Sequence, residues 1–163
     1  MKEQLIQQAY DVAKERYAAI GVDTDKAIAE LEKQQISLHC WQTDDVVGFE
    51  RNEALSGGIQ TTGNYPGRAR NIDEVRHDIE FVKTLLAGNH RLNLHEIYGD
   101  FGGKFVDRDQ VGVEHFQSWM DWARANNMKL DFNSTSFSHP KSGDLTLSNP
   151  DKGIREFWIE HTK

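Results

Sequence analysis

Polar side chains that could bind a small molecule gather at the ends of three short apolar stretches. Each stretch end carries a histidine or an aromatic residue beside amides and carboxylates: His39, Trp41, Gln42, Asp44 and Asp45; then Asn93, His95 and Glu96; then Asp131, Asn133, Phe137, Ser138 and His139. A lone histidine or tryptophan is more often structural, but the threefold recurrence favours one shared site. Carboxylates and amides bind vicinal hydroxyls, and an aromatic ring covers the apolar face of a sugar. The pattern therefore indicates a site for a polyhydroxylated ligand.

Thiol and metal chemistry have weaker support in the sequence. Cys40 alternates with His39 and Trp41, so we expect its side chain to point away from them into packing. As the single cysteine it cannot form an internal disulfide, which is typical of a reducing compartment. The sequence contains no H-E-x-x-H, no C-x-x-C and no pair of histidines at ligand spacing. No metal site is predicted from these residues.

Composition narrows the class of protein. The 163 residues carry a formal net charge of −7 without a block of like charges, which argues against a nucleic-acid partner. The first 21 residues lack the apolar core of a signal peptide, and no apolar run approaches the length of a membrane span. We expect a soluble cytoplasmic protein that contacts neither nucleic acid nor membrane.

The elements that must position these side chains follow from hydrophobic spacing. Residues 3–34 are predicted to hold two helical segments, the first of which stops at Gly21. Strands are predicted at 35–41, 91–98 and 128–134. Helices are predicted after each strand, starting at Asn71, at about residue 112, and at Asn149 and Pro150. Alternation of strand and helix predicts a parallel α/β fold, in which sites form at the carboxyl ends of the strands.

Two details of this arrangement are specific enough to test. Asn71 is predicted to cap its helix, with Glu74 bonding back, ahead of an apolar stripe formed by Val75, Ile79, Val82, Leu85 and Leu86. In the second strand, alternation predicts Asn93 and His95 on one face and Leu92 and Leu94 on the other. The polar face would then line the mouth of a closed barrel.

The long connection at 42–70 is predicted to be a binding loop. It contains several glycines, and loops of this length within a compact domain are usually lids or ligand loops. We expect residues 46–70 to close over the sugar site, the alternative being a fixed loop packed on the rim by Phe49, Ile59 and Tyr65.

Longer motifs in the chain resemble those of the bacterial L-rhamnose isomerase family. They are HCWQTDDVVGFE at 39–50, GGIQTTGNYPGRAR at 57–70, RLNLHEIY at 91–98, LDFNSTSFSHP at 130–140 and IREFWIEH at 154–161. The resemblance runs from near residue 5 to the last residue. Three departures concern loop geometry: Thr43 replaces a usual glycine, Ser134 a usual proline and Asn149 an expected histidine.

The resemblance implies a fold and an activity. The family is a (β/α)₈ TIM barrel that interconverts L-rhamnose and L-rhamnulose in rhamnose catabolism with a divalent metal, typically Mn²⁺. Residues 1–163 would form the N-terminal part of one barrel domain, with 1–34 as a helical extension and 35–163 as about the first three βα units. The full-length enzyme would be a homotetramer.

The same resemblance implies roles for individual residues. His95 resembles a substrate-side histidine of related metal-dependent sugar isomerases. Together with Trp41, Asn133 and Phe137, which the chemistry of sugar binding favours, it makes up the expected set of substrate-binding residues. Neither catalytic nor metal-binding residues are expected in this chain, because family members are more than twice as long and carry them in their second half. We therefore expect the chain alone to be inactive. Because part of a barrel leaves a strand edge and some of its core uncovered, we also expect the chain alone to self-associate or to be poorly stable.

Two alternatives remain open from the sequence. One is another metal-dependent barrel enzyme, such as a different aldose–ketose isomerase or an aldolase. The other is a non-catalytic fragment that only binds sugar.

Overall fold

A computed structural model describes residues 2–44, 46–50 and 67–163 of the chain. The contacts within it divide the chain into two compact units. The first comprises residues 1–36 with 87–89, and the second comprises residues 37–86 with 90–163.

The first unit holds the two helices predicted at 3–34, α1 (Glu3–Ala18) and α2 (Thr24–Leu31). Between them the chain reverses through Gly21, whose φ of 83° lies in the left-handed region that glycine adopts without steric cost. The side chain of Asp23 caps α2 by accepting a hydrogen bond from the Lys26 amide at 3.0 Å. The Tyr10 hydroxyl donates to Asp25 Oδ1 at 2.6 Å and ties the two helices together.

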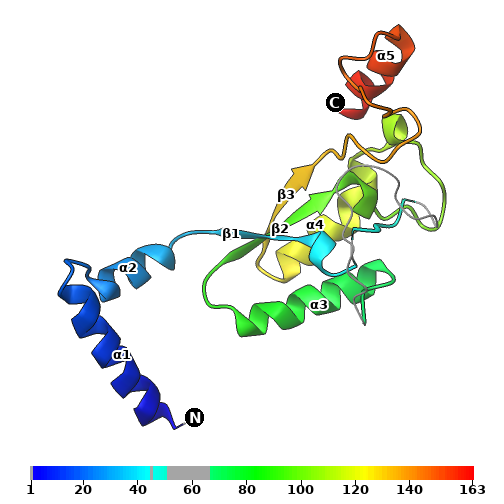
Figure 1. Ribbon diagram of the computed structural model, residues 1–163. Coiled ribbons are helices and arrows are strands. Elements are labelled where there is room, and N and C mark those ends of the chain that lie inside the picture. The colour runs from blue at the N-terminus through cyan, green and yellow to red at the C-terminus, as the bar shows by residue number, and fades with distance from the viewer. Residues whose placement is uncertain (1, 45, 51–66) are drawn as a thin grey trace. The chain divides into compact units, whose positions relative to one another are not determined.

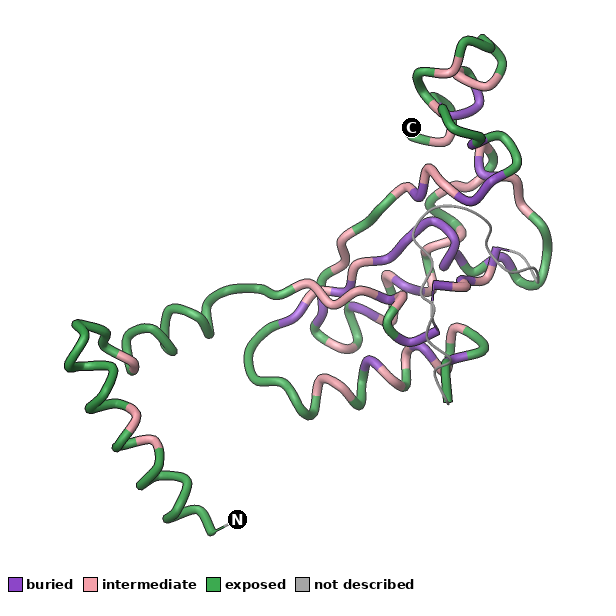
Figure 2. The backbone as a smooth tube through the Cα atoms, in the orientation of Figure 1, coloured by how far each residue is buried: buried purple, intermediate pink, exposed green. Residues whose placement is uncertain are grey.

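Neither helix of this unit buries a residue, although both carry apolar side chains at helical spacing (Figure 2). Large apolar residues exposed by at least a third of their surface are Leu5, Ile6, Val12, Tyr17, Ile20, Val22, Ile28 and Leu31. Hydrogen bonds and ion pairs between α1 and α2, rather than a core, hold this unit together.

The second unit is built around a three-stranded sheet in the order β1 (Ile36–His39), β2 (His90–His95) and β3 (Lys129–Asn133), with β1 starting at the unit boundary. β2 and β3 are parallel, with Arg91 opposite Lys129 and His95 opposite Asn133. This confirms an α/β arrangement with parallel strands.

All three strands are shorter than predicted. The predicted ends of the first and second strands form 3₁₀ turns instead, η1 (Cys40–Gln42) and η2 (Glu96–Tyr98). The ladder ends at Asn133 because its side-chain oxygen accepts the Thr135 amide at 2.8 Å and turns β3 away from the strand direction. The side chains after each strand are therefore presented on turns.

Two helices, α3 (Ile72–Leu85) and α4 (Gln117–Ala125), pack on the apolar face of this sheet (Figure 1). The shared core is a single cluster of buried residues: Cys40, Ala69, Val75, Ile79, Leu92, Leu94, Ile97, Tyr98, Trp119, Ala123 and Met128. Leu92 and Leu94 belong to it and Asn93 does not, as the alternation predicted. Cys40 is fully buried there, and burial raises the pKa of its thiol.

Asn71 caps α3 as predicted. The apolar stripe of α3 is shorter than its sequence spacing predicted. Asn71 Oδ1 accepts the Glu74 amide at 2.9 Å, whereas the Glu74 carboxylate bonds back to the Arg70 amide at 2.7 Å, one residue before the cap. Val75 and Ile79 are buried, but Leu85 is 68% exposed and Leu86 41% exposed. The stripe therefore ends earlier than its spacing predicted.

The last helix, α5 (Lys152–His161), starts later than predicted. Its cap is Asp151, whose Oδ1 accepts the Ile154 amide at 3.1 Å, rather than Asn149 or Pro150. Phe157 and Trp158 are buried as expected. The Trp158 indole donates to the Lys141 carbonyl at 3.0 Å, so α5 holds the loop that follows β3. No helix in the described part of the chain is long and apolar enough to cross a membrane.

Candidate functional site

The sheet face opposite α3 and α4 is polar, and it is built in rungs across the strands. In the first rung, Asp131 of β3 accepts Ser37 Oγ at 2.7 Å and Arg91 Nε at 2.7 Å. The hydrogen bond from the Arg91 guanidinium lowers the pKa of Asp131. In the second rung, Asn93 Nδ2 lies 3.3 Å from His39 Nδ1. These contacts fix the side chains of β1 against those of β2.

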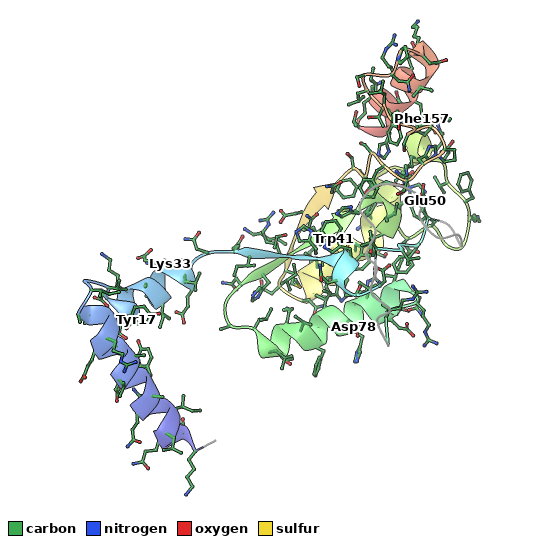
Figure 3. The ribbon with its side chains drawn as sticks, in the orientation of Figure 1. Tyr17, Lys33, Trp41, Glu50, Asp78 and Phe157 are labelled. Carbon is green, nitrogen blue, oxygen red and sulfur yellow. The ribbon has the colours of Figure 1, made fainter. Side chains whose placement is uncertain are left out.

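Aromatic rings form the third rung, at the carboxyl ends of the strands. The ring centroids of His39 and Trp41 are 4.7 Å apart and nearly parallel, and those of Trp41 and His95 are 4.8 Å apart. Phe137 meets His95 edge-on at 6.5 Å. Three of the four predicted substrate-binding residues are thus brought together; we call His39, Trp41, His95 and Phe137 the ring cluster. Figure 3 labels Trp41 at the end of β1.

The ring cluster and the adjoining Asn93 carry polar atoms without hydrogen-bond partners among the described residues. His95 is 2% exposed, and its Nε2 atom has no hydrogen-bond partner in the described part of the chain. The same holds for Trp41 Nε1 and for Asn93 Oδ1. Burial lowers the pKa of His95, with a further contribution from His39, so the neutral imidazole is favoured. Buried polar groups are nearly always hydrogen-bonded, so these atoms point to a ligand or to further polypeptide.

Asn133 is the fourth predicted substrate-binding residue. Among the described residues, no side-chain hydrogen bond joins it to the ring cluster. It is exposed, and its side-chain oxygen accepts the Thr135 amide. Its position opposite His95 in the β2–β3 register puts it at the correct end of the sheet. Its role in sugar binding stays a prediction.

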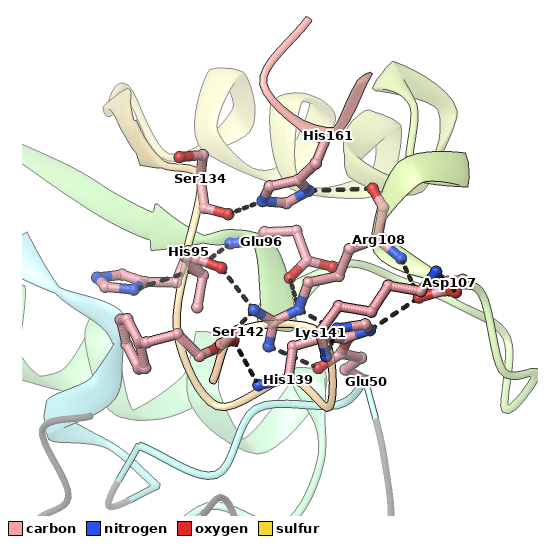
Figure 4. A network of polar contacts seen from close by, with 12 residues as sticks. Glu50, His95, Glu96, Asp107, Arg108, Ser134, His139, Lys141, Ser142 and His161 are labelled. Atoms are coloured by element: carbon pink, nitrogen blue, oxygen red, sulfur yellow. Dashed lines mark hydrogen bonds and ion pairs between the residues drawn. The ribbon is translucent and has the colours of Figure 1, made fainter. Parts of the chain in front are cut away.

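A buried arginine that the sequence did not single out organises the chain after β3 (Figure 4). Arg108 is 0% exposed, and its Nε and Nη2 donate to the two oxygens of Glu50 at 2.9 and 3.0 Å. Glu96 Oε2 lies 3.1 Å from Nε. Nη1 donates to the carbonyls of Thr135 at 2.5 Å and Phe137 at 2.6 Å. Only the planar fork of an arginine can reach all these acceptors at once.

No sequence pattern isolates Arg108, because its partners are far from it along the chain. Glu50 is 58 residues away and Phe137 is 29 residues away. The only available signal was Glu96, an acidic residue directly after an apolar strand and in need of a cation. We call Arg108, Glu50, Glu96 and the two carbonyls the arginine clamp.

Other polar residues at the strand ends have structural partners. Asp44 is 1% exposed, accepts the Tyr98 hydroxyl and accepts the Gly48 amide at 2.7 Å; burial raises its pKa. His139 Nε2 lies 2.9 Å from Asp107 Oδ1, and its Nδ1 accepts the Lys141 amide at 3.1 Å. These contacts shape the loops beneath the site rather than present groups to a ligand.

The expected lid at 46–70 lies mostly outside the described residues, which omit 51–66. The described parts at either end are anchored. The Phe49 amide donates to the Ile97 carbonyl at 2.6 Å, and the Ala69 amide donates to the Thr43 carbonyl at 2.7 Å. Whether the connection closes over a ligand stays a prediction.

Metal ligation finds no support in the residues described. No group of three or more histidine, cysteine, aspartate or glutamate side chains in the described ranges could hold a metal ion. The ring cluster and the neighbouring Asn93 offer one open histidine nitrogen, one indole nitrogen and one amide oxygen, which do not make a cation site.

Comparison with known proteins identifies the family. The L-rhamnose isomerase family model matches residues 4–163. The L-rhamnose isomerase of Bacteroides thetaiotaomicron is 69% identical over 163 residues, covering 99% of this chain and 39% of its own length. Those of Rhodopirellula baltica and Mannheimia succiniciproducens are 55% and 57% identical, covering 96% and 97% of this chain and 37% and 38% of their own lengths. The chain thus spans less than two fifths of these relatives, and it belongs to the L-rhamnose isomerase family.

Proposed function

We propose that this chain forms one wall of the sugar pocket in an enzyme that isomerises L-rhamnose to L-rhamnulose. The observation that carries the proposal is the ring cluster, with His95 Nε2 and Trp41 Nε1 open, in a chain of this family. A polypeptide that carries this chain and has the length of its relatives is called the full-length protein. The reaction is an aldose–ketose isomerisation, an intramolecular oxidoreduction in rhamnose metabolism.

The chemistry of the ring cluster suits a sugar. Flat faces of Trp41 and Phe137 can cover the C–H face of a monosaccharide, while a buried imidazole nitrogen and an indole N–H bind its oxygens. His39 stacks on Trp41 and is tied to Asn93, so the tryptophan ring is held in place before a ligand arrives. Asn133, at the rim, is proposed to bind an outer hydroxyl.

The metal chemistry is proposed to come from elsewhere in the full-length protein. Manganese is the ion that the family resemblance implies, and the described residues do not fit a metal. We therefore place its ligands in the part of the relatives' length that this chain does not span. Closure of the three strands into a (β/α)₈ barrel, assembly into a homotetramer and a cytoplasmic location belong to the same proposal.

The test is a sugar-isomerase assay of the purified full-length protein. With added Mn²⁺ it should convert L-rhamnose to L-rhamnulose, and Trp41→Ala should raise KM strongly. Trp122→Ala is the matched control, because Trp122 is a partly buried tryptophan of α4 whose indole donates to Glu80 of α3. Absence of rhamnulose formation by the unsubstituted protein would overturn the proposal.

Assays with a panel of aldoses and ketoses distinguish an L-rhamnose isomerase from another aldose–ketose isomerase and from an aldolase. Preferred turnover of another aldose would assign the protein to a different isomerisation, and cleavage of a ketose phosphate would assign it to an aldolase. Sugar binding without turnover in the presence of metal would favour the non-catalytic alternative.

A further inference from the structure

Thr135 sits in a strained conformation directly beneath the ring cluster. It follows β3, is 0% exposed and has a φ of 55°. A β-branched residue is rarely found in the left-handed region, because its side chain crowds the backbone. Such strain persists only where surrounding contacts determine the conformation, and it often marks functional sites.

The contacts that hold Thr135 come from both sides. Its amide donates to Asn133 Oδ1 at 2.8 Å, and its carbonyl accepts Arg108 Nη1 at 2.5 Å. Arg108 is itself fixed by the carboxylates of Glu50 and Glu96. The arginine clamp therefore fixes the place of the Thr135 hydroxyl relative to the end of β2.

That hydroxyl meets three groups. Its Oγ1 atom accepts the Glu96 amide at 3.1 Å and donates to the Asn133 carbonyl at 3.3 Å. His95 Nδ1 lies 3.4 Å from the same oxygen. A hydroxyl has one hydrogen and two lone pairs, so with its hydrogen on Asn133 and one lone pair on Glu96 it has one acceptor position left. For all three contacts of the hydroxyl to be hydrogen bonds, the imidazole hydrogen must lie on His95 Nδ1.

We infer that Thr135 is a positioning residue for His95, whose Nδ1–H it accepts so that the Nε2 lone pair remains open to a hydroxyl of the ligand. The contact is long, so it selects the tautomer and ring orientation rather than adding much stability. Nε2 is then an acceptor and Trp41 Nε1–H a donor, a pair suited to two oxygens of one sugar. Burial, which lowers the pKa of His95, works in the same direction by keeping the ring neutral.

The experiment rests on the proposed function and measures steady-state kinetics of the full-length protein with L-rhamnose. Thr135→Val keeps the shape and removes the hydroxyl, while Thr135→Ser restores a hydroxyl. Thr84→Val is the control, since that exposed hydroxyl donates to the Phe81 carbonyl of its own helix at 2.7 Å. We expect KM to rise roughly five- to tenfold in Thr135→Val, the equivalent of one hydrogen bond, with kcat changed less. Thr135→Ser and Thr84→Val should stay near the unsubstituted protein.

The outcomes separate the inference from the function on which it rests. A KM for Thr135→Val within twofold of the unsubstituted protein, or Thr135→Ser impaired as much as Thr135→Val, overturns the role of the hydroxyl. If Thr135→Val does not fold, Thr135→Gly is measured by the same criteria, because glycine accepts the positive φ while lacking the hydroxyl. No turnover of L-rhamnose by the unsubstituted protein overturns the proposed function, and the inference with it.

Discussion

At the scale of single residues, His95 combines burial with an open ring nitrogen. A structural histidine normally has both nitrogens bonded, as His139 has to Asp107 and to the Lys141 amide. His95 has one long contact, to Thr135, and rings on either side of it. This difference, rather than the residue type, separates a candidate ligand-binding histidine from a structural one.

The depressed pKa of His95 has a consequence for stability. In the folded protein its pKa lies below the ordinary value of 6.5, so in the window between the two values the unfolded chain binds more protons. The contribution of His95 to the free energy of unfolding therefore has its full value above pH 6.5, and it decreases as the pH falls from 6.5 through the lower pKa of His95 in the folded protein. Thermal denaturation of the full-length protein between about pH 5 and pH 8 should show His95→Gln flattening this dependence.

Substitution of another histidine is the control for this measurement. His77 is exposed on α3, and His77→Gln should leave the pH dependence as it is. Equal slopes for His95→Gln and the unsubstituted protein would show that His95 is not a buried neutral histidine.

At the scale of elements, tertiary contacts of the chain after β3 and of the chain after η1 position the site. The arginine clamp holds residues 135 and 137 after β3, while Asp44 and Ile97 hold the chain after η1 through the amides of Gly48 and Phe49. The strands fix the directions of the site residues, and these loop contacts fix their places.

Removal of the Arg108 guanidinium should be severe. Arg108→Met keeps the length of the side chain but removes the guanidinium that contacts the buried carboxylates of Glu50 and Glu96 and the two carbonyls. The expected loss is about 3–5 kcal/mol in the free energy of unfolding, measured by urea denaturation of the full-length protein. Arg124→Met is the control, because Arg124 pairs with Asp121 on the surface, and it should cost less than about 1 kcal/mol. Equal costs would contradict the clamp.

Gly48, in the chain after η1, packs closely against the backbone of Ile97. Its φ is +68°, and an added Cβ would lie 2.7 Å from the Ile97 carbonyl oxygen. Gly102 also has a positive φ, of +59°, but nothing lies within 4 Å of its would-be Cβ. Gly102→Ala should cost about 1 kcal/mol of conformational strain, and Gly48→Ala clearly more, because it adds a clash with backbone. Melting temperatures of the two variants decide the point; a similar loss in both would show that the loop relaxes.

At the scale of the whole molecule, the second unit has an unfilled apolar groove beside β3. The groove has a volume of about 490 Å³, and its apolar lining includes Val113, Phe116, Met120, Leu130 and Phe132. Phe132 is 57% exposed and Val113 72% exposed. β3 is an edge of the sheet, and an uncovered apolar strand edge tends to pair with other chains.

Because of this groove and strand edge, the 163-residue chain on its own is expected to self-associate. It is also expected to lack isomerase activity, because the metal ligands are proposed to lie outside its span. Light scattering should show oligomers, and added Mn²⁺ should not yield rhamnulose formation. Phe132→Lys should reduce the association, whereas Phe81→Lys, at a similarly exposed position on α3, should reduce it less. A monodisperse monomer with enzyme-like turnover would contradict both expectations.

The sequence by itself determined the elements and their order. The α/β class, the parallel strands, the faces of Leu92 and Leu94, the cap at Asn71 and the family follow from local spacing and from long motifs. These features depend on neighbours a few residues apart, which a sequence displays directly. The gathering of Trp41, His95 and Phe137 also followed, because carboxyl ends of parallel strands share one edge of the sheet.

Only the tertiary structure decided where the strands stop and what holds the site. The strand ends, the short stripe of α3, the arginine clamp and the Thr135 hydroxyl beside His95 depend on partners that are distant in the chain. The sequence does not distinguish a buried arginine from a surface arginine, or an imidazole nitrogen without a partner from a hydrogen-bonded one. Burial and partnership are properties of the packed molecule, and for that physical reason they could not be read from residue order alone.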